Sequence, residues 1–146
     1  MINLAYRVEA DMFHGERTSE PDVRERLGRA NATFLAIDDD AADSGPRRLA
    51  GAVYVEVRDR RGYFGMLAVD PSWQGRGLGR LLVRAVEDYC AKAGCVELDL
   101  DVVDLRAELP GFYHALGFTR TGSIPYPRPS ETKQPVHLIQ MTKRLA

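Results

Sequence analysis

The segment from residue 63 to residue 102 restricts the possible folds more than any other part of the chain. It predicts a strand over 63–69 (YFGMLAV), a loop with three glycines, an amphipathic helix, and a second strand over 96–102 (VELDLDV). Two strands joined through a helix lie parallel in one sheet, with a right-handed crossover. The chain must therefore form a sheet with at least one parallel pair of strands.

The helix that follows the glycine loop is the most clearly patterned element of the sequence. Its apolar residues recur at spacings of three and four, which predicts one buried stripe. The stripe consists of Leu78, Leu81, Leu82, Ala85, Val86, Tyr89, Cys90 and Ala93. Gly94 is expected to end the helix in the left-handed conformation.

The remaining segments predict antiparallel strands and two further helices. The expected strands cover 3–8, 32–37, 49–58, 118–123 and 136–143. The expected helices run from Ser19 to about Ala30 and from Glu108 to Leu116. The expected loops cover 38–48 and 124–135. Alternation over 49–58 indicates a half-buried strand that forms a hairpin with 63–69. The expected fold class is α/β (mixed α+β), a largely antiparallel mixed sheet with one parallel strand step and helices on both faces.

Composition and charge exclude several classes of protein. The chain has 146 residues, 45% of them hydrophobic and 28% charged, which is typical of one globular domain over residues 1–146. A net charge of −1 provides no field that would attract nucleic acid or an anionic membrane. No apolar stretch reaches the roughly 18 residues of a membrane span, and the N-terminus lacks the pattern of a secretion signal. We expect a cytoplasmic protein that binds neither nucleic acid nor membrane.

The two cysteines, Cys90 and Cys95, are too few for a disulfide framework. Zinc would need further ligands at short spacing. Free cysteine behaves as a small hydrophobic residue. We therefore expect two buried thiols and no metal site.

Three glycines, Gly75, Gly77 and Gly79, stand at the start of the amphipathic helix. Glycine destabilises a helix by up to about 1 kcal/mol per residue relative to alanine, so three of them need a reason. Without a Cβ atom the backbone can approach a ligand, and the unpaired amides at a helix start bind anions. A diphosphate suits such a site. Arg80 and Leu81 exclude both the Walker loop and the dinucleotide fingerprint, which need other residues there.

The spacing of Gln74, Gly77 and Gly79, after a strand that ends in LAV, resembles the GNAT superfamily of acetyl-CoA-dependent N-acetyltransferases. A second motif of that family, Tyr-x-x-x-Gly-Phe, is matched by Tyr113, Gly117 and Phe118. The resemblance covers about residues 49–143 and implies acetyl-CoA as cosubstrate.

The resemblance also implies roles for individual residues. The backbone of Leu67 to Val69 would hold the pantetheine arm as if it were another strand, with the Leu67 amide near the thioester oxygen. Tyr113 would protonate the departing CoA thiolate after direct attack by an amine. The implied cofactor-binding residues are Leu67, Ala68, Val69, Gln74, Gly75, Arg76, Gly77, Leu78, Gly79 and Arg80.

The sequence departs from the family pattern at two positions. Arg106 stands where many members have an asparagine that contacts the cofactor arm, and Tyr63 stands where some have a glutamate base. Glu56, on the adjacent strand, is our candidate general base and would act through water. The alternative is that Glu56 is an exposed strand carboxylate.

Acidic residues also lie along one face of the strand at 96–102. Glu97, Asp99 and Asp101 alternate there, and Asp104 follows. Like charges on neighbouring positions repel unless they are solvated or face cations. This row is either a solvent-exposed face or a surface that attracts a cationic amine.

We therefore expect an enzyme that transfers an acetyl group from acetyl-CoA to a primary amine of a small molecule, with Tyr113 as general acid. Three alternatives stay open: a non-catalytic acyl-CoA-binding sensor or partner module, which Arg106 and Tyr63 favour, a protein N-acetyltransferase, and a pure interaction domain. The last strand, VHLIQMTK (136–143), could pair across a homodimer or lie inside the sheet.

Overall fold

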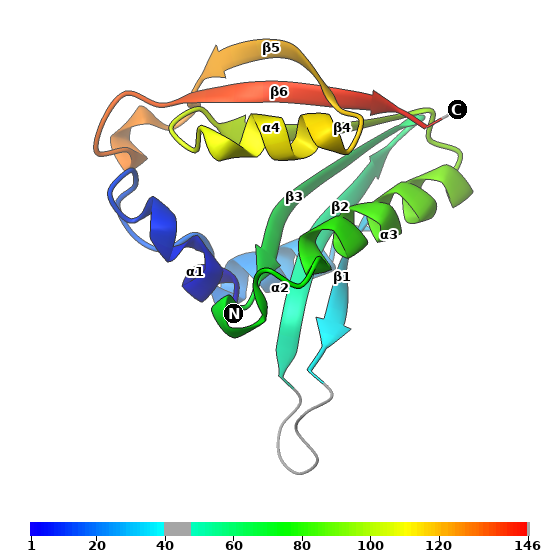
Figure 1. Cartoon of the computed structure of the whole chain (residues 1–146), viewed down its shortest axis with the longest axis horizontal. Helices are drawn as coiled ribbons and strands as arrows, with labels where there is room; N and C mark the ends of the chain where they lie inside the picture. Colours follow the sequence, from blue (N-terminus) through cyan, green and yellow to red (C-terminus); the bar gives the residue numbers. More distant parts are fainter. Residues whose placement is uncertain (40–47, 146) are drawn as a thin grey trace.

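The computed structural model describes residues 1–39 and 48–145, so most of the loop expected over 38–48 lies outside the described residues (Figure 1). The strands form one sheet in the order β1-β2-β3-β4-β6-β5. Their bounds are β1 Ala32–Asp38, β2 Leu49–Arg58, β3 Arg61–Val69, β4 Glu97–Val103, β5 Thr119–Pro125 and β6 His137–Arg144. Only β3 and β4 pair in parallel among the described strands. These pairings confirm the predicted sheet with its single parallel step.

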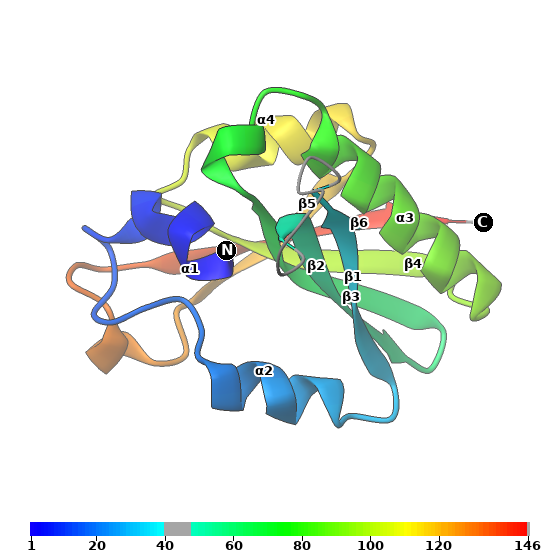
Figure 2. The same ribbon diagram turned by 90° about the horizontal axis from the view of Figure 1, so that it is seen from below.

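Four α-helices accompany the sheet in the described part of the chain: α1 Ile2–Ala5, α2 Glu20–Leu27, α3 Leu78–Lys92 and α4 Glu108–Ala115. Figure 2 shows α3 and α4 on one side of the sheet and α2 on the other, which confirms helices on both faces. Short 3-10 turns cover Tyr6–Glu9, Pro71–Trp73 and Pro129–Glu131. Among the helices in 1–39 and 48–145, none has the length and apolar character needed to cross a bilayer.

The strand predicted over residues 3–8 is wrong, because this segment forms α1 and the following 3-10 turn. An extended segment would need a neighbouring strand, whereas a helical turn closes its own backbone hydrogen bonds. The Ala5 amide donates to the Met1 carbonyl, and Asn3 exchanges hydrogen bonds with the backbone of Thr18. The segment that follows begins as predicted, since the Ser19 hydroxyl accepts from the Asp22 amide at the start of α2.

β2 is buried on both faces, not half-buried as its alternating sequence predicted. The strand lies between β1 and β3, and α3 covers one of its faces. On the other face the guanidinium of Arg26, from α2, lies 4.9 Å from the centre of the Tyr54 ring. A second layer of the protein covers this face, so the polar side chains of β2 are buried. The periodicity of the sequence does not reveal this layer.

The buried stripe of α3 is also displaced from the predicted one. Leu82, Val86 and Cys90 are buried as expected, but Val83 joins them while Leu81 is 53% exposed and Tyr89 lies partly in solvent. The helix is amphipathic as predicted, but its neighbours decide which flank of the stripe they cover. Gly94 follows the helix with φ of +87°, as predicted.

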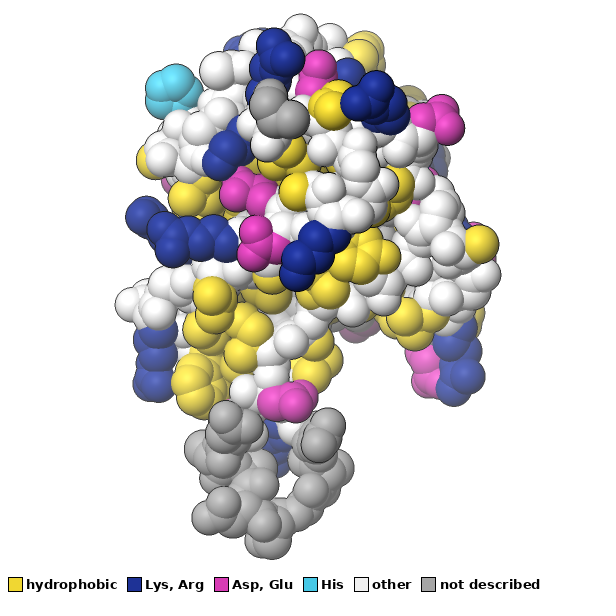
Figure 3. Space-filling view, turned by 90° about the vertical axis from the view of Figure 1, so that its right-hand side faces the viewer, with side chains coloured by type: hydrophobic (Ala, Val, Ile, Leu, Met, Phe, Trp, Pro, Cys, Tyr) yellow, Lys and Arg dark blue, Asp and Glu magenta, His cyan; other side chains and the backbone are white. Residues whose placement is uncertain are grey.

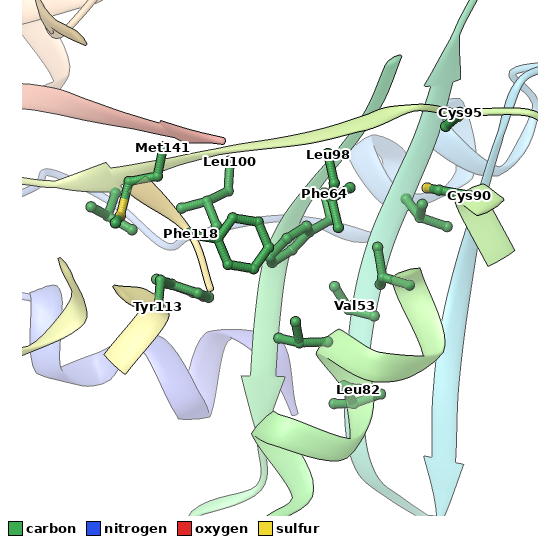
Figure 4. Packing of buried hydrophobic residues seen from close by; sticks show 14 of the residues in the cluster. Val53, Phe64, Leu82, Cys90, Cys95, Leu98, Leu100, Tyr113, Phe118 and Met141 are labelled. Atoms are coloured by element: carbon green, nitrogen blue, oxygen red, sulfur yellow. The ribbon is translucent and has the colours of Figure 1, made fainter. Parts of the chain in front are cut away.

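The main core lies between the sheet and the helices α3 and α4 (Figure 4). Phe64, Tyr113 and Phe118 form a triangle of edge-to-face rings with centroids 5.9–6.0 Å apart. Cys90 and Cys95 are free and buried, which confirms the prediction of core thiols. β6 lies between β4 and β5 in the sheet, so the last strand is internal. Figure 3 shows hydrophobic side chains gathered on the lower half of the face in view, with most of the charged side chains above them.

β3 leaves β4 after a short common stretch. The two strands pair only between Arg61–Tyr63 and Glu97–Asp99. Beyond this point Met66 has φ of +52°, and two residues of β3 oppose one residue of β2, which is a β-bulge. Figure 1 shows β3 turning away from β4 and β6. The bulge therefore opens a gap in the sheet at the carboxyl end of β3.

The core packs so closely against β3 that no side chain fits at Gly62. A Cβ atom at Gly62 would lie 2.5 Å from the Cys90 sulfur. Gly62→Ala should lower the free energy of unfolding by about 1–3 kcal/mol through overpacking, measured by urea denaturation. The control is Gly111→Ala in α4, where a Cβ would meet nothing within 4 Å and helix propensity favours alanine. Equal stability of Gly62→Ala and the wild type would contradict this packing.

Candidate functional site

The loop between β3 and α3 is held in shape by its own side chains. The Asp70 carboxylate accepts hydrogen bonds from the amide and the hydroxyl of Ser72, at 2.9 and 2.6 Å. The Gln74 side-chain amide donates to the Val69 carbonyl at 3.2 Å, which ties the loop to the end of β3. The helix start is thus fixed relative to the strand that precedes it.

Two glycines make the loop a cradle of backbone atoms. Gly75 and Gly77 both have φ of +79°, a conformation that residues with a Cβ atom rarely adopt. A Cβ at either position would meet nothing within 4 Å, so the space above them is open. The glycines are needed for the turn, and the open space leaves room for a ligand.

The N-terminus of α3 presents backbone donors to this cradle. Gly77 precedes the helix without a capping side chain, and the Leu81 amide makes the first bond of the helix, to the Gly77 carbonyl. In the described part of the chain the amides of residues 78–80 have no acceptor. Free amides at the positive end of a helix dipole bind anions.

The cradle forms a hollow of about 250 Å³. It is lined by Val69, Trp73, Gln74, Gly75, Gly77, Leu78, Gly79, Arg80 and Phe112. Of the predicted diphosphate-binding residues only Arg76 is not part of the lining, and its guanidinium stacks 4.7 Å from the centre of the Trp73 ring. The tertiary structure brings the other predicted residues of the loop to one place.

A larger cavity, of about 530 Å³, includes residues from both sides of the gap between β3 and β4. Leu67 and Tyr113 line it, and the buried rings and aliphatic side chains of the core continue from them. Tyr63 and Asp101 line it from the opposite face of the sheet. Val69 belongs to the smaller hollow and Ala68, between them, is buried.

Tyr113 is only 6% exposed, although it lines this cavity. The rings of Phe64, Phe112 and Phe118 surround it at centroid distances of 5.0–5.9 Å. Burial raises the pKa of the Tyr113 hydroxyl above its ordinary value. The hydroxyl is therefore protonated at neutral pH and able to act as a proton donor.

Glu56 lies outside both hollows, and it is buried (8% exposed), so the alternative of an exposed carboxylate is wrong. Its oxygens accept hydrogen bonds from the Tyr54 hydroxyl and from Arg58 Nε, both at 2.8 Å. The bond from Arg58 lowers the pKa of the carboxyl group. Glu56 is thus a tightly bonded carboxylate on β2 that does not line the cavity containing Tyr113, although its cross-strand partner Tyr63 does.

Arg106 forms a brace that sequence reasoning missed. Its guanidinium pairs with Glu9 at 2.9 Å and with Glu108 at 2.7 Å, and it joins the N-terminal 3-10 turn to the start of α4. Burial raises the pKa of Glu9, and the bond from Arg106 opposes this shift. The departure from the family asparagine was visible in the sequence, but a partner 97 residues away was not.

The residues of the acidic row differ in their hydrogen-bond and ion-pair partners. Arg61 pairs with Glu97 and Asp99, at 2.7 and 2.8 Å, and Thr142 donates a hydrogen bond to Asp99. Asp104 accepts from the His137 amide at 3.0 Å. Asp101 alone of these four residues lines the larger cavity.

The comparisons with known proteins agree with this geometry. Residues 3–118 match the model of the Acetyltransferase (GNAT) family. The chain is 37% identical over 113 residues to a mycothiol acetyltransferase of Gordonia bronchialis, which covers 73% of this chain and 35% of that protein. It is 32% identical over 99 residues to glucosamine 6-phosphate N-acetyltransferase 1 of Oryza sativa subsp. japonica, 64% of this chain and 58% of that protein. The chain thus spans 35% to 58% of the length of these relatives.

A solved structure shows the same fold over nearly the whole chain. The ribosomal-protein-S18-alanine N-acetyltransferase from Escherichia coli superposes with a TM-score of 0.74 at 22% sequence identity. The match covers 99% of this chain and 88% of that one. At this identity the likeness concerns the fold alone.

The Arg106 brace can be tested by comparing its two carboxylates. Glu9→Ala should lower the free energy of unfolding by about 1–3 kcal/mol, because it leaves a half-buried guanidinium without its buried partner. Glu108→Ala should cost less than about 1 kcal/mol, because the Glu108 side chain is 62% exposed. Urea denaturation of both variants measures the difference. Equal losses would mean that the contact with Glu9 does not stabilise the fold.

Proposed function

Because the chain belongs to the Acetyltransferase (GNAT) family, we propose that it transfers an acetyl group from acetyl-CoA to a primary amine of a small molecule. The observation that carries the proposal is the position of the two hollows along one short segment of β3. A cradle of free backbone amides lies at one end of the β3 segment Leu67–Val69, and a cavity lined by Tyr113 lies at the other. Two relatives named for acetylation of mycothiol and glucosamine 6-phosphate support a small-molecule acceptor.

The cradle has the chemistry to hold a diphosphate. When bound, acetyl-CoA supplies an acetyl group activated as a thioester, and its diphosphate carries negative charge. The open space above Gly75 and Gly77 and the unbonded amides of residues 78–80 suit such an anion, and Arg80 adds a side-chain cation. The proposed diphosphate-binding residues are Gln74, Gly75, Arg76, Gly77, Leu78, Gly79 and Arg80.

The end of β3 supports binding of an extended chain. β4 pairs with β3 only as far as Tyr63, so the backbone edge from Leu67 to Val69 has no β4 partner. Unpaired edge groups of a strand readily bond a further strand-like segment. We assign the pantetheine arm to this edge, through Leu67, Ala68 and Val69.

Tyr113 fits the role of general acid. A tyrosine hydroxyl is protonated at neutral pH, burial raises the pKa of Tyr113 further, and the residue lines the same cavity as Leu67. In this role it donates a proton to the sulfur as the carbon–sulfur bond breaks, while the amine nitrogen that forms the new bond to the acetyl carbon gives up its proton to solvent water. We assign no proton transfer to Glu56, because its oxygens are bonded to Tyr54 and Arg58 outside the cavity.

We also propose that residues 1–146 act as one acetyltransferase domain. Residues 32–144 build a single sheet, and the N-terminal helices supply one wall of the larger cavity. Arg106 was a main sequence argument for a non-catalytic module. Its ion pair with Glu9 gives the residue a structural role, so its presence no longer argues against catalysis. A sensor would bind acetyl-CoA without releasing CoA, and a protein acetyltransferase would prefer peptide acceptors.

Gly77→Glu tests the position of the diphosphate. A negative side chain at the mouth of the cradle should raise the Kd for acetyl-CoA by more than about tenfold, measured by calorimetry. Gly94→Glu is the matched control, because Gly94 also has a positive φ and open surroundings but follows the opposite end of α3. Both variants carry similar backbone strain. If Gly77→Glu binds acetyl-CoA like Gly94→Glu, the diphosphate lies elsewhere.

Tyr113→Phe tests the chemistry. Acetyl-CoA mixed with a panel of small primary amines should release CoA thiol, and the variant should lower kcat by about 100-fold while the Kd for acetyl-CoA changes less than about threefold. Tyr89→Phe, on the outer side of α3, should behave as the wild type. Binding of acetyl-CoA without thiol release from any amine would favour the sensor, and release only with peptides would favour a protein substrate.

A further inference from the structure

Asp101 differs from the other acidic residues that line the larger cavity. Glu9 is paired with Arg106 at 2.9 Å and Glu131 with Arg128 at 2.7 Å. Glu16 accepts a hydrogen bond from the Asn3 side chain at 2.7 Å. Asp101 makes no hydrogen bond and no ion pair with any residue in 1–39 or 48–145. Its negative charge is therefore not compensated by the surrounding protein.

The neighbours of Asp101 on the sheet increase this imbalance. Arg61 forms ion pairs with two residues of the acidic row, Glu97 and Asp99. Asp101 is exposed to solvent, yet neighbouring atoms desolvate its carboxylate in part. This desolvation and the charge of Asp99 raise the pKa of Asp101, and Arg58 opposes the shift. A bound cation would offset both effects.

The arginines around the cavity do not supply that cation. Arg58 bonds Glu56 and lies over the Tyr63 ring, Arg26 bonds Asp22, and Arg128 bonds Glu131. Arg17 lies over the Tyr6 ring, 5.3 Å from its centre. Arg7 also lines the cavity. None of these guanidinium groups forms an ion pair with Asp101 among the described residues.

Asp101 lies on the opposite face of the sheet from Tyr113. The neighbours of Asp101 on β4, Leu100 and Val102, point into the core beside Tyr113. Asp101 therefore points to the other face, where Tyr63 also lines the cavity. Since the cavity includes residues of both faces, a molecule that contacts Asp101 on one side can reach Leu67 and Tyr113 on the other.

The walls near this acid are aromatic. Tyr6, Phe13, Tyr63 and Tyr126 line the same cavity, and the rings of Phe13 and Tyr126 meet edge to face at 5.1 Å. Aromatic faces attract both flat apolar groups and cations. A carboxylate without a partner next to such walls is suited to an organic ammonium ion.

We propose that Asp101 binds the ammonium group of the acceptor, so that this protein selects cationic amines with an apolar, ring-bearing body. This inference deepens the proposed function and rests on it in treating the bound amine as the acetyl acceptor. Binding of an amine at the site can be tested without turnover. The role is recognition: the carboxylate attracts and orients the amine at the entrance of the cavity. It explains why one member of the acidic row is left without a protein partner.

Benzylamine, which is a cation at neutral pH, and benzyl alcohol, which is neutral and of similar size, are the two probes. In NMR titrations of the full chain, benzylammonium should bind the wild type about 10- to 100-fold more tightly than Asp101→Asn. Benzyl alcohol should bind both proteins equally and weakly. Asp104→Asn, just beyond the end of the same strand and outside the cavity, is the matched control and should bind benzylammonium as the wild type does. Equal binding of benzylammonium to the wild type and Asp101→Asn would overturn the proposal.

Turnover separates this inference from the proposed function. With the best cationic acceptor of the amine panel, Asp101→Asn should raise KM about 10- to 100-fold and leave kcat within about threefold, and Asp101→Glu should recover part of the loss. An unchanged KM in Asp101→Asn would overturn the Asp101 site while the transferase stands. Asp101-dependent binding of benzylammonium without CoA release from any amine would support the site and overturn the transferase. An unchanged Kd for acetyl-CoA verifies that the variants are folded.

Discussion

The bulge at Met66 is the constraint on which the rest of the site depends. It ends the pairing of β3 with β4 after Tyr63, and a sheet that is otherwise continuous opens into a gap. The gap frees the backbone edge of Leu67–Val69 and lets one cavity include residues from both faces. Tyr113 and Asp101, on opposite faces, can serve one reaction only because of this opening.

Charge is balanced locally in the molecule, which is why a net charge of −1 is compatible with binding an anionic cosubstrate. The start of α3 offers positive potential from backbone amides, without a cluster of basic side chains. Several charged side chains in the described part of the chain form ion pairs with each other, as in the pairs of Arg106 with Glu9 and Arg61 with Asp99. Among the acidic residues of the larger cavity, only Asp101 has no hydrogen-bond or ion-pair partner in the described part of the chain.

Predictions from the sequence were accurate where the physical cause is local. The order of the main strands and the parallel step follow from periodicity and connection length. The cradle follows from glycine spacing, so the residues between 74 and 80 that line it, all except Arg76, could be named in advance. Predictions failed where a distant segment decides the outcome. Residues 3–8 alternate like a strand but have no strand to pair with, and β2 alternates like a surface strand but is covered on both faces. Glu56 was a candidate base in the sequence analysis. Its bonds to Tyr54 and Arg58, which argue against that role, are not visible in a linear sequence.

By itself the sequence determined the element types, the turn at Gly75 and Gly77, and the motif residues of the family, because each depends on backbone preferences within a few positions. The tertiary structure decided which of the named residues meet. Tyr113 and Leu67 come to one cavity, whereas Glu56 remains outside it, and Arg106 finds Glu9 across 97 residues. Only folding fixes such pairings, because the charge and burial of a side chain depend on the layers that pack around it.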